Sequence, residues 1–331
     1  MPQVVCIGEG LFDSISDEPG VELSQVSAWT LYPGGAPANV ACALTKLGTT
    51  SGFIGAIGQD AMGAELLEVL RSHSVDLSGV QLVPGMPTRS VMVTRDIMGD
   101  RTFAAFGHDR SSDSFADTKL NAEYLPMELI QSAQYLVTGT LLLAYPESAA
   151  ALSNAMDLAR YSGVQVVVDV NWRSVFWDDE QRAKAIILEV LHQADYLKLT
   201  DEEADWLFGS RDLTQLHDRF PRLKCILMTR GEYGCLYWAA ETLGDGLGDV
   251  PAFAMDVEDT TGAGDSFLAG FLHQLCNRTG SGELRPDEAR EIVRYASAVG
   301  ALTTLQRGAI AASPTSDEVA TFLFLQDRMR A

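Results

Sequence analysis

Basic side chains are scarce in this sequence of 331 residues. It has 24 Lys and Arg against 45 Asp and Glu, which gives a formal net charge of −21. Proteins that bind nucleic acid need a basic surface, so this balance excludes DNA and RNA as partners. An anionic ligand must instead be held by local cations, backbone N–H groups or a metal ion, against the field of the whole molecule.

Paired cysteines and long apolar runs are missing as well. The five cysteines are scattered singly, with no Cys-x-x-Cys pair and no Cys/His spacing of the kind that binds metal. They are expected to be small buried residues in a reducing compartment. No apolar stretch is long enough to cross a bilayer, and no signal-type segment opens the chain. The sequence predicts a cytoplasmic protein with no membrane partner.

Two common nucleotide-binding motifs are also absent. Gly8 and Gly10 follow a strand-like run, but Asp13 occupies the third glycine position of a dinucleotide fingerprint and no helical pattern follows. The chain has no Gly-Lys-Ser or Gly-Lys-Thr sequence, and therefore no Walker A loop. These absences argue against an NAD-dependent oxidoreductase and against a P-loop nucleotide site.

The most informative motif that is present spans residues 259–265, Asp-Thr-Thr-Gly-Ala-Gly-Asp. Apolar residues recur directly after it at the spacing of one helical face. A helix N-terminus with bare glycine backbone attracts anions, because its N–H groups lack partners and its dipole favours negative charge. Asp265 then has two interpretations. It is either a helix N-cap or a base that deprotonates a hydroxyl as it attacks a phosphoryl group.

A second glycine-rich loop covers residues 33–39, Pro-Gly-Gly-Ala-Pro-Ala-Asn. Its glycines let the backbone approach a ligand closely, and Pro37 suits the first turn of a helix. Asn39 either caps that helix or hydrogen-bonds a polyhydroxy ligand. Asp13 lies just beyond the first predicted strand, where ligands gather in parallel sheets. A solvated turn is the alternative interpretation of Asp13.

Short apolar runs alternate with helical patterns over the later two thirds of the chain, which is typical of parallel α/β folds. Earlier, the β-type runs 88–94 and 101–106 flank a turn and predict a hairpin. We therefore predict an α/β fold in which a central, mostly parallel sheet is flanked by helices. A small β-sheet lid is expected from about 11–33 and 86–110, within a single domain of residues 1–331.

Polar residues follow three of the predicted strands at the point where each strand ends. Because these ends meet at one edge of a parallel sheet, the polar residues are expected to outline one crevice. They are Asp169, Asn171 and Arg173, then Lys198, Thr200 and Glu203, then Thr229, Arg230 and Gly231. In so acidic a chain, the two arginines and the lysine are the local cations that a polyphosphate needs. We place Arg173 in the catalytic set and Asn171 on the acceptor side, because both follow a buried strand directly.

Together, the two glycine-rich loops resemble the signatures of the ribokinase-like, or PfkB, carbohydrate kinases. The N-terminal signature is similar to residues 34–39 with the following segment 55–58, and the C-terminal one to residues 259–265 and the helix after them. The resemblance extends over essentially the whole chain. Gly8-Glu9 ahead of Asp13, and the form of the first loop, are most similar to the fructokinase branch.

The resemblance implies three roles around the sugar and the transferred phosphoryl group: a catalytic base, an anion hole and ligands of the sugar hydroxyls. Asp265 matches the catalytic base, which takes the proton from a primary sugar hydroxyl. The backbone of Gly262, Ala263 and Gly264 matches the anion hole around the transferred γ-phosphoryl group. The positions that hold sugar hydroxyls are matched by Asp13, Gly34, Gly35 and Asn39.

For the nucleotide and metal, the resemblance implies ATP, Mg²⁺ and, in members that use it, K⁺. Thr200 and Glu203 match the family's Asn-x-x-Glu motif, in which the Glu organises hydrated Mg²⁺, although Thr replaces the Asn. ATP contacts are implied for Thr229, Gly231 and Gly234, together with the cations Lys198 and Arg230, while Ser297 falls where an Asn often meets adenine. Asp259 and Thr261 match carbonyl donors to a monovalent cation.

The predicted function is therefore ATP-dependent phosphorylation of a small sugar, with D-fructose O6 as the favoured acceptor. Segment 107–113 departs from the Arg-Asn-Pro-Ser-Ala-Asp type of sequence that fructokinases usually carry, and His108 or Arg110 is a candidate sugar contact there. Ribose, ketodeoxygluconate and a nucleoside stay open as acceptors. A non-catalytic scaffold is the alternative from another class. The lid strands are also expected to offer a homodimer contact.

Overall fold

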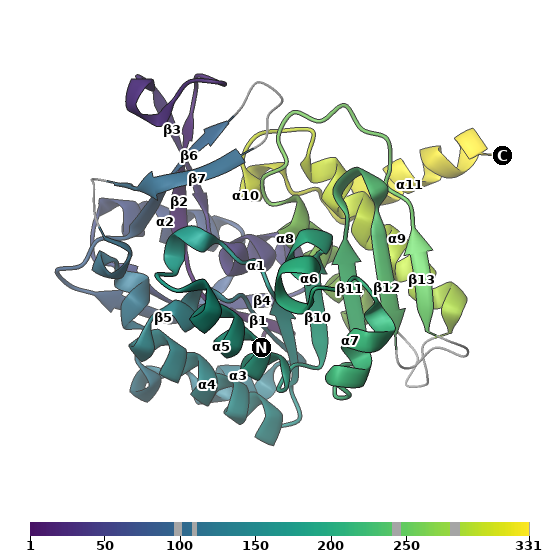
Figure 1. The fold of residues 1–331 in the computed structure, drawn as a ribbon, viewed down its shortest axis with the longest axis horizontal. Helices are drawn as coiled ribbons and strands as arrows, with labels where there is room; N and C mark the ends of the chain where they lie inside the picture. Colours follow the sequence, from purple (N-terminus) through teal and green to yellow (C-terminus); the bar gives the residue numbers. More distant parts are fainter. Residues whose placement is uncertain (96–100, 108–110, 240–245, 279–284, 331) are drawn as a thin grey trace.

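A computed structural model describes residues 1–95, 101–107, 111–239, 246–278 and 285–330. Its largest element is a nine-stranded sheet that crosses the molecule (Figure 1). In sheet order the strands are β5 (Asp76–Val83), β4 (Ser51–Gly58), β1 (Val4–Ile7), β8 (Tyr135–Thr138), β9 (Gln165–Asp169), β10 (Tyr196–Thr200), β11 (Cys225–Thr229), β12 (Cys235–Ala239) and β13 (Leu247–Val250). All neighbours from β5 to β11 are parallel, whereas β12 and β13 join through antiparallel pairs. The predicted mostly parallel sheet is confirmed.

Strand β1 shows why this sheet forms from apolar runs. All four of its residues are buried. Val5 and Ile7 belong to the apolar cluster on one face of the sheet, and Val4 and Cys6 to the cluster on the other. Successive side chains of a strand point to opposite faces, so a run without polar residues requires cover on both sides.

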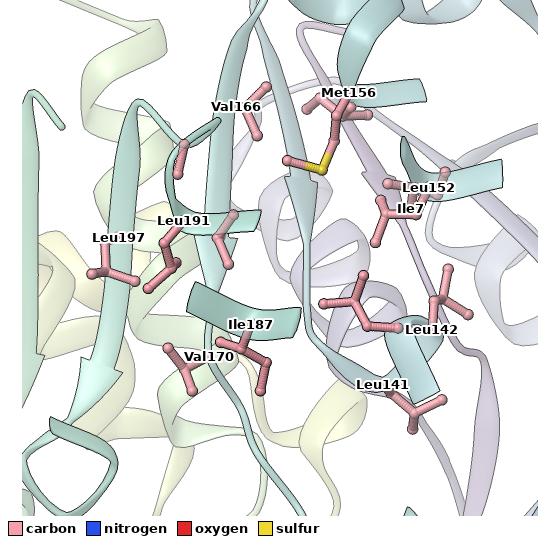
Figure 2. Packing of buried hydrophobic residues seen from close by; sticks show 14 of the residues in the cluster. Ile7, Leu141, Leu142, Leu152, Met156, Val166, Val170, Ile187, Leu191 and Leu197 are labelled. Carbon is pink, nitrogen blue, oxygen red and sulfur yellow. The ribbon is translucent and has the colours of Figure 1, made fainter. Parts of the chain in front are cut away.

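Helices provide that cover as two layers. One layer consists of α3 (Met127–Ser132), α4 (Pro146–Tyr161), α5 (Glu180–Leu191), α6 (Asp201–Phe208) and α7 (Leu213–Arg219). The other consists of α1 (Ala36–Leu47), α2 (Ala61–Ser72), α8 (Ala263–Cys276), α9 (Pro286–Thr303), α10 (Ala309–Ala312) and α11 (Ser316–Arg330). Figure 2 shows the first core, where Met156 of α4 and Ile187 of α5 pack with residues of the central strands.

The second sheet is smaller and stands beside one end of the main sheet, at the upper left of Figure 1. Its order is β3 (Trp29–Gly34), β2 (Leu11–Ser16), β6 (Arg89–Arg95) and β7 (Arg101–Phe106). Strand β2 pairs antiparallel with β3 and parallel with β6, which joins segment 11–33 to the β6–β7 pair. The predicted small sheet is therefore present. The turn at 96–100 lies outside the described residues.

Two further observations concern the chain as a whole. In the part that the structure describes, no helix combines the length and the apolar character needed to cross a membrane. All five cysteines lie within the described ranges and all are unpaired thiols, four of them buried. Burial raises the pKa of the Cys42 and Cys276 thiols to about 12. Neither thiol is therefore a reactive thiolate at neutral pH.

Candidate active site

A cavity of about 1420 Å³ opens where β9, β10 and β11 end and the first turn of α8 faces them. Ligands bind at this edge in open α/β sheets. Most of the residues singled out from the sequence line this one cavity. They are Asn171, Arg173, Lys198, Thr200, Glu203, Thr229, Gly231, Gly234, Thr261, Gly262, Ala263, Gly264, Asp265 and Ser297.

The Gly-Ala-Gly turn forms the start of helix α8 rather than a loop ahead of it. The N-cap is Gly262, whose φ of 71° is left-handed, and the helix begins at Ala263. A Cβ on Gly262 would lie 2.3 Å from the Cβ of Ala309, so the position needs glycine for its space as well as its conformation. Asp265 lies in the first turn and caps nothing. The N-cap interpretation of Asp265 is wrong.

Asp265 is partly buried and hydrogen-bonded on the side away from the nucleotide strands. The side-chain amide of Asn39 donates to its Oδ2 over 2.8 Å. Burial raises the pKa of Asp265 to about 6, and the charge of Asp169 acts in the same direction, while Asn39, Lys198 and Arg173 lower it. The carboxyl group is mostly ionised at neutral pH but close to its pKa, which is the condition that suits a general base.

A buried ion pair lies beneath the Gly-Ala-Gly turn. Nζ of Lys198 is 2.7 Å from Oδ2 of Asp169, and both side chains are almost fully buried. Burial acts to lower the pKa of Lys198, but the charges of Asp169 and Glu203 outweigh it and the pKa is raised. A Cβ on Gly264 would lie 3.1 Å from the same Nζ. The ammonium group therefore lies directly against the bare backbone of the turn, as a permanent cation.

Glu203 is fixed by backbone N–H groups from two segments. Thr200 and Glu203 form a capping box at the start of α6, in which the Glu203 carboxylate accepts from the Thr200 N–H over 2.8 Å. Its other oxygen accepts from the N–H of Trp172 over 2.8 Å. Asn171, the residue before, has a φ of 38°, a left-handed conformation that asparagine tolerates better than most residues. The carboxylate orientation is thus set by the loop that also carries Arg173, whose Nη1 donates to the Trp172 carbonyl.

The turn after β11 is built from two glycines with positive φ, Gly231 at 51° and Gly234 at 89°. A Cβ on Gly234 would lie 2.1 Å from the carbonyl oxygen of Val250, so this turn packs closely against the end of β13. On the opposite wall, Ser297 donates its hydroxyl to the carbonyl of Val293 over 2.8 Å. The Ser297 hydroxyl proton is therefore already donated to a backbone carbonyl within helix α9.

Arg230 differs from the other predicted nucleotide residues, because it is not among the residues that line the cavity. Its Nη2 donates to Oδ1 of Asp249 over 2.6 Å and to the carbonyl of Tyr233 over 3.0 Å. These bonds direct the guanidinium toward β13. Its contact with ATP stays a prediction.

The four predicted sugar residues Asp13, Gly34, Gly35 and Asn39 are not among those that line this cavity. A Cβ on Gly34 would lie 3.2 Å from Oδ2 of Asp13 and 3.7 Å from Oδ1 of Asn39, so these side chains converge on one turn. Gly35 has a φ of 102° and caps helix α1. The bond from Asn39 to Asp265 connects this group of residues to the cavity.

Asp259 organises the turn that precedes α8. It is buried, and its Oδ1 accepts bonds from the Thr261 N–H over 3.0 Å and the Thr261 hydroxyl over 2.6 Å. Its Oδ2 accepts a bond from the Gly308 N–H over 3.3 Å. These bonds use both carboxylate oxygens of Asp259, whereas the predicted K⁺ contact concerns its backbone carbonyl and stays a prediction.

Sequence reasoning missed a buried cluster at the base of the small sheet. Arg89 is buried at the start of β6 and donates two bonds to Asp117, of 2.6 and 2.8 Å. Four aromatic rings surround its guanidinium carbon at 4.6 to 5.3 Å: Phe106, Phe115, Tyr145 and Phe176. The only signal in the sequence was a charge directly ahead of an apolar strand. The cluster joins the small sheet to the loop after Arg173. Residues 108–110, with His108 and Arg110, lie outside the described residues.

The sequence also matches known proteins. A family model described as pfkB family carbohydrate kinase covers residues 1–316. The chain is 36% identical over 326 residues to a probable fructokinase-2 of Arabidopsis thaliana, which covers 98% of this chain and 96% of that protein.

Solved structures match over nearly the same length. The fructokinase of Xylella fastidiosa with bound ATP superposes with a TM-score of 0.86 at 25% identity, covering 99% of this chain and 100% of that one. A double mutant of the fructokinase of Vibrio cholerae O395, with fructose, ADP and a potassium ion bound, gives a TM-score of 0.83 at 27% identity, covering 98% of both chains.

Proposed function

This chain belongs to the pfkB family of carbohydrate kinases, and within that family we propose that it phosphorylates D-fructose at O6 with ATP. An ATP-dependent sugar kinase activity follows from the family and from the fructokinases that the chain resembles. The choice of fructose is supported by those same relatives. The observation that carries the assignment of the site is the bond between Asn39 and Asp265, beside the Gly-Ala-Gly turn.

In the proposed reaction, Asp265 is the general base. Its carboxylate accepts the proton of the sugar's primary hydroxyl as the hydroxyl oxygen attacks the γ-phosphorus of ATP. The bond from that phosphorus to the oxygen bridging it to the β-phosphate breaks, and ADP leaves. Asp13, Gly34, Gly35 and Asn39 hold the other sugar hydroxyls, with Asn171 at the edge of the same site.

Charge on the transferred phosphoryl group is stabilised from three sides. We assign the anion hole to the backbone N–H groups of Gly262, Ala263 and Gly264 at the positive end of α8, where the Ala263 N–H also donates to the Thr260 carbonyl over 3.3 Å. The ammonium of Lys198 lies beneath that turn, as its 3.1 Å approach to a Cβ on Gly264 indicates. Arg173 supplies a second cation from the cavity wall. These groups are fixed before the reaction starts, which is what makes such stabilisation effective.

ATP is assigned to the turn after β11 and to the wall formed by α9. The residues are Lys198, Thr200, Thr229, Arg230, Gly231, Gly234, Gly264 and Ser297.

Mg²⁺, when bound, neutralises phosphate charge and keeps several of its waters. Glu203 fits an outer-sphere role, because both of its carboxylate oxygens already accept backbone N–H bonds. Among the described residues no group of three or more His, Cys, Asp or Glu offers a direct metal site. We assign the carbonyls of Asp259 and Thr261 to K⁺.

The remaining assignments concern the small sheet. We propose that residues 1–331 form one kinase domain in which about 11–33 and 86–110 act as a lid over the sugar. The exposed face of this sheet is proposed as a homodimer contact, and Leu31 on β3 is 51% exposed there. A reducing, cytoplasmic setting is part of the proposal, because the five thiols are unpaired.

The acceptor is tested by measuring ADP release from the purified protein with fructose, ribose, glucose, ketodeoxygluconate and adenosine, each across a concentration series. We expect the highest kcat/KM with fructose, and a phosphorus-coupled NMR spectrum of the product that places the phosphate on O6. A higher kcat/KM with another acceptor would overturn the choice of fructose. No turnover on any of the five would favour the scaffold alternative.

A further inference from the structure

Glu9, the second residue after strand β1, has no role in the reaction described above. Its side chain is only 4% exposed. Oε1 accepts a 3.1 Å hydrogen bond from the N–H of Ala36, the first residue of helix α1. Oε2 is buried and has no hydrogen-bond partner among the described residues. The backbone of Glu9 is equally close to this turn, because its carbonyl oxygen lies 2.5 Å from where a Cβ on Gly35 would stand.

The charges around Glu9 are negative. Asp117 from the segment after β7 and Asp265 from α8 both act on its carboxyl group. No cation pairs with Glu9 in the part of the chain that the structure describes, and Asp117 is itself bonded to Arg89. The pKa of Glu9 is raised to about 8: burial is the largest cause, the bonds from backbone N–H groups act to lower the pKa, and the charges of the two aspartates act to raise it. At neutral pH Glu9 therefore carries a proton.

We propose that Glu9 is a positioning residue for the acceptor side of the site, which as a neutral carboxylic acid holds the Gly34–Gly35 turn and Asn39 beside Asp265. The proposal rests on the function proposed above. Asn39 lies one helical turn into α1, so the helix start that Glu9 holds also sets the position of the amide that contacts Asp265. A neutral acid fits this site because an ionised carboxylate would be buried without a cation, beside two others.

Ionisation of Glu9 has a specific consequence. A third negative charge at this place repels Asp117 and Asp265, and it favours water entry or displacement of the turn. The N-terminus of α1 attracts an anion, but this effect does not outweigh burial, since the net direction of the pKa shift is upward. Sugar binding is therefore expected to weaken as the pH rises through about 8, whereas ATP binding at the other end of the cavity is not.

The test compares Glu9→Gln and Glu9→Ala with the parent between pH 6.5 and 9.5. Gln keeps the acceptor for the Ala36 N–H and cannot ionise, whereas Ala removes the contact. We expect the sugar KM of the parent to rise at least tenfold from pH 7 to 9.5 and that of Glu9→Gln to stay within about twofold. Glu9→Ala should have a raised sugar KM at every pH, while the KM for ATP stays constant in all three. An alkaline rise in Glu9→Gln that parallels the parent, or an unchanged KM in Glu9→Ala, would overturn the proposal.

A second readout does not depend on kinase activity. Between about pH 4.5 and 8 the native state holds a proton on Glu9 that the unfolded chain releases, because the pKa is about 8 in the fold against 4.5 for an ordinary Glu side chain. The parent should therefore lose Tm relative to Glu9→Gln as the pH rises through this window, and the difference should level off above it. Exposed Glu65→Gln is the matched control and should show no such trend. A Tm difference that is constant with pH would overturn the buried-acid assignment even if no acceptor were phosphorylated, whereas a growing difference supports it.

Discussion

The amide of Asn39 reaches the carboxylate of Asp265 over 2.8 Å, although 226 residues separate them in the chain. This bond joins the two glycine-rich loops into one site. It also orients the carboxylate, because one of its oxygens is bonded and the other is left for a hydroxyl group.

Asp265→Asn tests the proposed base. The amide is nearly isosteric but cannot accept the proton, so we expect kcat to fall by roughly two or more decades, as for loss of a general base. Folding and ATP affinity should be retained. Turnover by ADP release and ATP binding by calorimetry are the measurements, and exposed Asp157→Asn is the control. Turnover at the parent rate would remove Asp265 from the mechanism.

The acid side of the pH profile tests the Asn39 contact. The pKa of Asp265 is raised to about 6, mainly by burial, so activity should fall as the pH drops through this value and the base becomes protonated. The bond from Asn39 lowers that pKa. Asn39→Ala should therefore move the acid limb of kcat at saturating sugar to higher pH, while Asn277→Ala leaves it in place. A limb that stays put or moves to lower pH contradicts the assigned contact.

Gly264→Ala tests the close approach of the ammonium to the turn. The new Cβ would lie 3.1 Å from Nζ of Lys198, a cation that its bond to Asp169 keeps from moving away. We expect kcat to fall by about two to three decades, the size of a lost oxyanion donor. Little net change in stability is expected, because the tight contact opposes the gain in helix propensity, which is at most about 1 kcal/mol for Ala over Gly in a helix interior. Gly139→Ala, whose nearest neighbour is 3.9 Å away, is the control. Equal kcat in both variants would place the ammonium outside the reaction.

A double-mutant cycle separates the structural and chemical roles of Lys198. Lys198→Met leaves Asp169 buried without its partner, which typically costs about 3–5 kcal/mol of unfolding free energy. Adding Asp169→Asn removes the stranded charge and should recover most of that stability in urea titrations. The kcat of the double variant should nevertheless stay low. Recovery of turnover along with stability would mean that Lys198 serves the fold alone.

Several elements were predictable because their signals are local. The sequence predicts helices over 146–161 and 201–208, and α4 and α6 have these bounds. Each helix begins with a recognisable start signal, which is a proline at the first position of α4 and a capping box at the start of α6. Strand β5 was not predicted. Most of its residues are only partly buried, so it shows neither an apolar run nor a clean alternation.

The residues of the candidate site also fall into two groups, those that a local sequence pattern predicts and those that it does not. The glycine-rich loops could be predicted from the sequence, because their glycines and the carboxylates beside them form short local patterns of residue types. The burial of a charged side chain, in contrast, cannot be recognised from a local pattern of residues. Arg89 and Asp117 are 28 residues apart and pair only because the small sheet brings them together, and Glu9 is protonated only because the fold encloses it. Such groups depend on tertiary contacts, and no short pattern encodes them.

Strand β1 lies inside the main sheet, between β4 and β8, and it is synthesised before both of these neighbours. Its neighbour β8 follows more than a hundred residues later, and the 226 residues between Asn39 and Asp265 take roughly 10 to 45 s to synthesise at about 5–20 residues per second. During that time the apolar faces of the N-terminal segment have no cover from α8. Nascent chains stalled before α8 should therefore engage chaperones strongly, and chains extended beyond α11 should lose that engagement.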